Sequence, residues 1–182
     1  RREGVAGSVT FINLEGTRPI LIEIQALVDK SMLPNPKRLT VGTDAQRLTM
    51  LLAILHRHVT LSTYDQDVFL NAVGGIKISE TASDLAVLIA IVSSMTNQAV
   101  SSKTAIFGEV GLGGEIRPVS RGQERIKEAS KLGFTRIIVP LKNKAADIPD
   151  VEIIGVDNLR DAVKVVFGSN RVNHDDQVYP DE

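Results

Sequence analysis

Residues 74–86 read GGIKISETASDLA and residues 108–125 read GEVGLGGEIRPVSRGQER, and these two stretches decide the fold. The first breaks a strand at a glycine pair and passes through polar residues, including Ser83, into an apolar helix from Leu85. The second turns tightly around its glycines and leads into a charged helix that carries Gln123. The sequence therefore predicts two segments that each lead into a helix. The first carries the hydroxyl of Ser83, and the second carries the side-chain amide of Gln123.

The two stretches resemble the active-site framework of Lon-type Ser-Lys peptidases, in which the first supplies a serine and the second a lysine. Ser83 falls at the serine position, but Gln123 falls at the lysine position. A serine hydroxyl needs a neighbouring base at neutral pH, and an amide cannot take up a proton there. We therefore expect no catalytic residue in this chain, only vestigial dyad positions at Ser83 and Gln123.

No other basic side chain in the sequence matches the lysine position of the dyad. The candidates are two histidines in a different predicted helix, one histidine in a polar tail, and two lysines outside the dyad position, namely His56, His58, His174, Lys77 and Lys127. The structural interpretation of the first stretch is that Ser83, Thr81 or Ser79 caps the helix that follows. We favour this interpretation over a catalytic serine.

Composition limits the classes of function. The chain has 182 residues, of which 43% are hydrophobic and 24% charged, as in a folded domain with a sizeable core. Its net charge of -1 gives no global signal for nucleic acid, so any such surface must be local. The absence of cysteine excludes disulfides and thiolate metal sites, and it fits a cytoplasmic protein. No apolar run is long enough to span a membrane.

The rest of the sequence alternates between strand and helix patterns. Strands are expected at 9–14, 20–28, 67–73 and 136–139, with a hairpin formed by 104–110 and 115–119. Helices are expected from a cap at Thr43 or Asp44 to His58, over 85–95, over 121–132 with Gly133 as C-cap, and after a cap at Asp157. Residues 30–42 contain two prolines and predict a loop.

The pattern predicts an α/β (α+β) domain over 1–168, with helices packed on a mixed sheet, followed by a disordered tail over 169–182. The start at Arg1, without a methionine, suggests a piece of a longer protein.

The glycines between Gly108 and Gly114 raise the possibility of a phosphate-binding loop. A Walker loop needs a Lys-Ser or Lys-Thr pair opening a helix after its last glycine. Glu115-Ile116 follows instead, and the next residues alternate as in a strand. We therefore expect a hairpin turn and no nucleotide site.

Basic residues gather near the dyad positions. Arg117, Arg121 and Arg125 surround Gln123, and Lys77 follows the glycine break of the first stretch. If the sheet brings the two stretches together, these cations share one surface, which either contacts DNA phosphates or is a solvated face. Arg18, Lys37 and Arg38 form a second possible cluster on loops.

Several further motifs extend the resemblance to a specific family. They are EGTRP at 15–19, EIQALV at 23–28, NPKR at 35–38, DQDVFLN at 65–71 before the glycine pair, and FGEVGL at 107–112. In this order the motifs resemble the C-terminal Lon-protease-like domain of the bacterial RadA (Sms) family of DNA repair proteins. The resemblance covers about residues 4–167.

The resemblance implies a fold like ribosomal S5 domain 2 and the Lon proteolytic domain. It implies a hexameric ring that acts in homologous recombination and branch migration, with single-stranded or branched DNA and a recombinase filament as partners. ATP, magnesium and zinc are implied only for other parts of the family protein, and none is expected in this chain. The expected DNA contacts are Lys77, Arg117, Arg121, Arg125, Lys37 and Arg38. Two alternatives stay open, namely an active Ser-Lys peptidase and a pure assembly scaffold without DNA contact.

Overall fold

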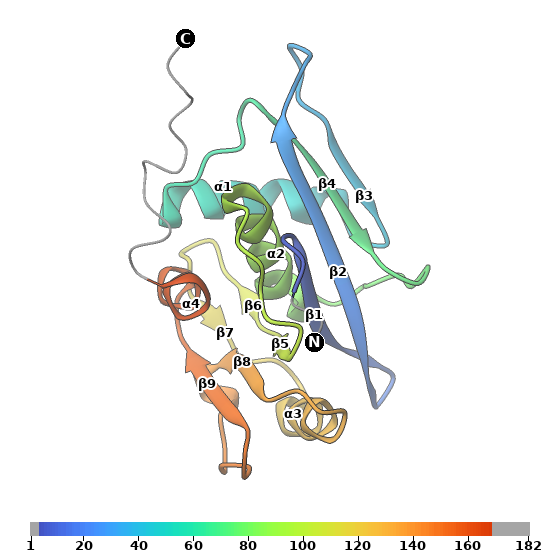
Figure 1. The fold of residues 1–182 in the computed structure, drawn as a ribbon, viewed down its shortest axis with the longest axis vertical. Coiled ribbons are helices and arrows are strands. Elements are labelled where there is room, and N and C mark those ends of the chain that lie inside the picture. Colours follow the sequence, from blue (N-terminus) through green and yellow to red (C-terminus); the bar gives the residue numbers. More distant parts are fainter. Residues whose placement is uncertain (1–3, 169–182) are drawn as a thin grey trace.

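A computed structural model describes residues 4–168 as a mixed sheet covered by helices (Figure 1). The strands of the main sheet are β1 (Ser8–Glu15), β2 (Arg18–Lys30), β3 (Arg38–Val41), β4 (Gln66–Ala72), β5 (Thr104–Ile106), β8 (Arg136–Pro140) and β9 (Glu152–Val156). A small hairpin consists of β6 (Glu109–Val110) and β7 (Ile116–Arg117). The helices are α1 (Ala45–Val59), α2 (Asp84–Thr96), α3 (Gly122–Lys131) and α4 (Leu159–Phe167), with short 3-10 turns η1 (Thr81–Ser83) and η2 (Leu141–Asn143).

The main sheet has the order β3-β4-β2-β1-β5-β8-β9. The long strands β1, β2 and β4 pair antiparallel, and a short hairpin turn joins β1 to β2. The other neighbours, including β1 with β5 and β8 with β9, pair parallel, and helix α1 connects the parallel strands β3 and β4. The mixed α/β class predicted from the sequence is confirmed.

Helix α2 is the centre of the core. Its residues from Asp84 to Ser93 are all buried, because it packs against β1 and β2 and also contacts α1 and α4. The sequence predicts this burial, since 85–95 is apolar on nearly every side. Helix α3 contacts β1, β2 and β8 instead, so the charged helix of the second stretch packs on a different part of the sheet from α2.

Three local predictions are wrong. Residues 38–41 form the edge strand β3 within the predicted loop, because the two prolines precede the strand and leave its own N–H groups intact. Helix α4 is capped by Asn158 and not by Asp157, since the Asn158 side chain accepts the Asp161 N–H. The predicted strand 104–110 is split between the main sheet and the hairpin, because Gly108 N–H leaves the sheet to bond Ala82 O at 2.8 Å.

Other predictions are confirmed at the level of elements. Asp44 caps α1 by accepting the N–H groups of Gln46 and Arg47, and Gly133 follows α3 with a φ of +92°. The predicted tail at 169–182 lies outside the described residues. Within residues 4–168, no helix has the length and apolar character needed to cross a membrane.

Gly42 provides a test of the fold beside the candidate site. Its φ is +79°, and an added Cβ would stand 2.5 Å from Ile76 O and 2.9 Å from Ala72 Cβ. Gly16 has a similar φ of +59° but nothing within 4 Å of an added Cβ. We expect Gly16→Ala to lower the free energy of unfolding by about 1 kcal/mol, and Gly42→Ala by about 3 kcal/mol or more, in urea denaturation. Equal losses would contradict the close packing at Gly42.

Candidate functional site

The two decisive stretches lie against each other in the structure. Gly108 exchanges backbone hydrogen bonds with the start of α2, donating to Ala82 O at 2.8 Å and accepting from Leu85 N at 3.0 Å. The Val110 N–H donates to the Asp84 carboxylate at 3.0 Å. The hairpin β6–β7 is therefore fixed to the helix start by hydrogen bonds from both backbone and side chain. The predicted hairpin turn is confirmed in place of a phosphate-binding loop.

A buried ion pair anchors the start of α2. Asp84 is 1% exposed and accepts hydrogen bonds from both Arg47 Nε, at 3.0 Å, and Arg47 Nη2. Burial raises the pKa of Asp84 above its ordinary value, although the bonds from Arg47 and the Val110 N–H act in the opposite direction. The Asp84 carboxylate in turn raises the pKa of Arg47. We conclude that the pair fixes geometry at the helix start more than it adds net stability.

A second buried ion pair joins the first stretch to the second. The Arg125 side chain is 0% exposed and donates through Nη1 and Nη2 to the two oxygens of Glu80, at 2.6 and 3.0 Å. Two further donors reach backbone carbonyls, with Nη1 bonded to Ile12 O at 2.8 Å and Nε to Ser120 O at 3.0 Å. The guanidinium also lies 5.7 Å from the centre of the Phe107 ring. One side chain thus connects β1, the loop before α2 and the loop before α3.

Ser83 is held in a structural role. It is buried, and its hydroxyl donates to the Glu80 carbonyl at 3.0 Å. It precedes α2 but makes no side-chain capping bond, and neither does the N-cap of η1. The prediction of a side-chain cap at this helix is therefore wrong. The hydroxyl bonds backward to a carbonyl because the short turn η1 curls the chain there before α2 begins.

Gln123 belongs to a different set of contacts. It is exposed on α3, and its amide nitrogen donates to the Asn143 carbonyl at 2.7 Å. Asn143 also bonds both backbone groups of Val119, so η2 docks on the segment before α3. No hydrogen bond joins Gln123 to Ser83 within residues 4–168. The residues at the two dyad positions therefore lie on connected stretches and bond to different backbone carbonyls.

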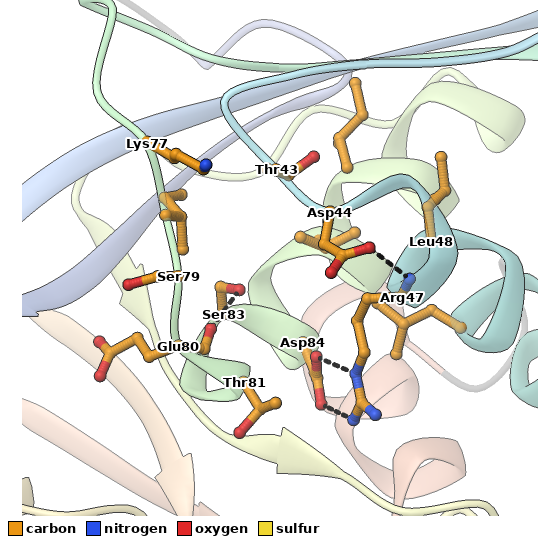
Figure 2. Close-up of a pocket in the computed structure, with 14 residues that line it drawn as sticks. Thr43, Asp44, Arg47, Leu48, Lys77, Ser79, Glu80, Thr81, Ser83 and Asp84 are labelled. Atoms are coloured by element: carbon orange, nitrogen blue, oxygen red, sulfur yellow. Dashed lines mark hydrogen bonds and ion pairs between the residues drawn. The ribbon is translucent and has the colours of Figure 1, made fainter.

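A pocket of about 420 Å³ opens beside Ser83 (Figure 2). The loop from Lys77 to Thr81 forms one wall, and the start of α1, with Asp44 and Arg47, forms the other. Ser83 and Asp84 stand between these walls at the helix start. Gln123 does not line this pocket, whereas Lys77 does.

The structure divides the six cations expected to contact DNA. The expectation that Arg125 contacts DNA is corrected, because a fully buried guanidinium that is bonded to Glu80 cannot reach a phosphate. Arg117 is exposed but pairs with Glu115 at 2.8 Å and lies 3.9 Å from Glu109. Arg121 is exposed at the N-terminal end of α3 and Lys77 is exposed at the pocket.

The second predicted cluster is also divided. Arg38 is half-buried and donates to the carbonyls of Thr63, at 2.7 Å, and Gln66. Burial lowers its pKa. Its guanidinium therefore fixes the edge strand β3 to the start of β4 and to the loop before it. Lys37 remains exposed beside it.

Two exposed lysines that the sequence analysis did not select join Arg121. Lys142 and Lys144 flank Asn143, the residue that binds Gln123 and Val119. This contact brings η2 against the start of α3, so the three cations lie on neighbouring segments. The contact between η2 and α3 joins residues about twenty positions apart, and such a contact leaves no periodic pattern in the sequence. The two lysines on either side of Asn143 are evident in the sequence, but their nearness to Arg121 is not.

The Arg125–Glu80 pair yields a stability test. Glu80→Gln keeps the shape but leaves a buried cation without its counter-charge, so we expect a loss of about 3 kcal/mol in the free energy of unfolding. The control is Glu152→Gln, which removes a carboxylate that is 65% exposed and 3.2 Å from Arg136. That change should cost less than about 1 kcal/mol. Urea denaturation of both variants checks the difference, and similar losses would contradict the role given to Arg125.

The chain is similar in sequence to known proteins. Residues 50–143, more than half of the chain, match the family model described as subunit ChlI of Mg-chelatase. DNA repair protein RadA of Pseudomonas aeruginosa is 54% identical over 167 residues, which are 91% of this chain and 37% of that protein. RadA of Escherichia coli is 54% identical over 164 residues (90% and 36%), and RadA of Bacillus subtilis is 43% identical over 170 residues (92% and 37%).

The chain thus spans little more than a third of the length of these curated relatives. The matches themselves cover about nine-tenths of this chain. By these matches the chain belongs to the family of the ChlI model, and over nine-tenths of its length it is homologous to a segment of the DNA repair proteins named RadA.

Proposed function

We propose that this chain is a Lon-protease-like domain of a RadA-type DNA repair ATPase and that it acts without catalysis. In this proposal it is a platform for assembly into a hexameric ring and for binding single-stranded or branched DNA. The full-length protein would act in homologous recombination and branch migration, beside a recombinase filament. The similarity to RadA over nine-tenths of the chain is the observation that carries the proposal.

The geometry around Ser83 supports the absence of catalysis. A serine nucleophile requires a base within hydrogen-bond reach, and the Ser83 hydroxyl donates to a backbone carbonyl that cannot serve as one. Gln123 is bonded to Asn143 and could not accept a proton in any case. We assign ATP, magnesium and zinc chemistry to parts of the full-length protein outside this stretch, because the sequence of this stretch contains neither a Walker motif nor a cysteine.

The surface that we assign to DNA consists of Arg121, Lys142 and Lys144, and we call it the α3–η2 surface. All three are exposed, and none forms an ion pair with another described residue. Phosphate contacts need cations that are free to exchange small counterions, which the buried Arg125 and the paired Arg117 are not. A ring would repeat this weak surface and strengthen its hold on one strand.

The test is a titration of fluorescent oligo-dT by anisotropy at several salt concentrations. We expect the triple variant Arg121→Gln, Lys142→Gln, Lys144→Gln to bind about tenfold more weakly at moderate salt, and to lower the slope of log K against log salt by about 2. A matched control removes three exposed cations elsewhere, Arg57→Gln, Lys103→Gln and Lys164→Gln.

The two parts of the proposal fail separately. If the unmodified protein showed no salt-sensitive binding to DNA, the DNA-binding function itself would be contradicted. If it bound DNA but the triple variant and the control variant had the same slope, the function would stand and the α3–η2 surface would be the wrong site.

A further inference from the structure

The pocket beside Ser83 has no role in the function proposed above, yet it has the features of a binding site. Its floor is made of aliphatic side chains, namely Leu48, Leu51, Leu70, Ile78 and Val87. No aromatic ring lines it. An apolar floor of this size with a few polar groups at its mouth is the usual form of a pocket that takes an apolar group from a ligand.

Two polar groups at the pocket lack partners among the described residues. The hydroxyl oxygen of Thr43 is buried and makes no hydrogen bond. The Lys77 ammonium has no ion pair, and Figure 2 shows its side chain extending over the pocket from the opposite wall. A buried hydroxyl without a partner is costly, so these groups favour a ligand that supplies an acceptor.

The acidic groups around the pocket are already engaged. Asp44 accepts the N–H groups of Gln46 and Arg47 as the cap of α1. Glu80 is bonded to Arg125, and Asp84 to Arg47. Lys77 is the cation at the mouth that has no ion pair within residues 4–168, and it favours an anionic group on the ligand.

The wall that carries Lys77 also offers backbone groups. Residues 76–79 belong to no helix or strand, and Ile78 N–H donates to Gly42 O at 2.7 Å. The flanking N–H groups of Lys77 and Ser79 have no hydrogen-bond partner within residues 4–168. Backbone N–H groups of this kind bind an extended peptide by adding to it as a neighbouring strand does.

We propose that this pocket binds, without cleaving it, a segment of a partner protein in which an aliphatic side chain stands next to a carboxylate. The aliphatic group occupies the floor, the carboxylate meets Lys77 and the Thr43 hydroxyl, and the segment's backbone runs along residues 76–79. A flipped nucleotide fits this site less well, because bases in single-strand sites stack on rings and the floor has none.

The probes are three fluorescein-labelled hexapeptides that differ only at a central pair, which is Leu-Glu, Leu-Gln or Ser-Glu. We expect the Leu-Glu peptide to bind, and each of the other two to bind about fivefold more weakly, in anisotropy titrations. In NMR spectra the amide signals of Lys77 and Ser79 should shift on addition of the Leu-Glu peptide.

Two variants test the assigned contacts. Lys77→Gln should abolish the difference between the Leu-Glu and Leu-Gln peptides, whereas the control Lys142→Gln, which changes an exposed lysine outside the pocket, should preserve it. Thr43→Val should weaken Leu-Glu binding severalfold while leaving the melting temperature unchanged or higher, because it removes an unpaired buried hydroxyl. This opposite response of binding and stability separates a ligand contact from a structural one.

Three results would overturn the proposal. They are no binding of the Leu-Glu peptide at millimolar concentration, equal affinity for all three peptides, and full displacement of the peptide by oligo-dT with the same amide shifts. The last result would assign the pocket to single-stranded nucleic acid.

Discussion

The buried guanidinium of Arg125 is the constraint on which the rest of this structure depends. It is fully enclosed, yet its donors reach a carboxylate and two backbone carbonyls that come from distant parts of the chain. Enclosing a charge is costly unless every donor is satisfied, so Ile12, Glu80 and Ser120 must hold their positions together. The pocket wall, the α2 start and the α3 start are set by this one side chain. The other pair joins the partly exposed Arg47 to the buried Asp84 and fixes the opposite wall.

These two ion pairs also involve most of the charged side chains at the junction. The charges at the junction are used to hold segments together, and the hydroxyl between them is bonded to a carbonyl. What the arrangement leaves free is an aliphatic hollow, one ammonium and an unpaired hydroxyl. Those groups can bind and orient a ligand. The cations on α3 and η2 lie on another part of the surface, so DNA and a protein partner need not compete.

Sequence patterns predicted most of the elements because the core signals were strong. The apolar run from Leu85 and the cap at Asp44 gave α2 and α1, and the glycines after Gly108 gave the hairpin. The edge strand β3 was missed because nearby prolines dominate its window. The site residues were harder to predict, because tertiary contacts decide whether a cationic side chain is exposed or buried. Arg121 and Arg125 are one helical turn apart, and nothing local shows that the first is exposed and the second fully buried.

The most direct test of the central claim is labelling of the purified chain with a fluorophosphonate probe, followed by mass spectrometry of the peptide that contains Ser83. The probe forms a covalent bond only with a serine whose hydroxyl is activated by a base. The account predicts no adduct on Ser83 above the level found at other serines, and no change in any labelling for Ser83→Ala. Stoichiometric modification of Ser83 that disappears in Ser83→Ala would contradict it.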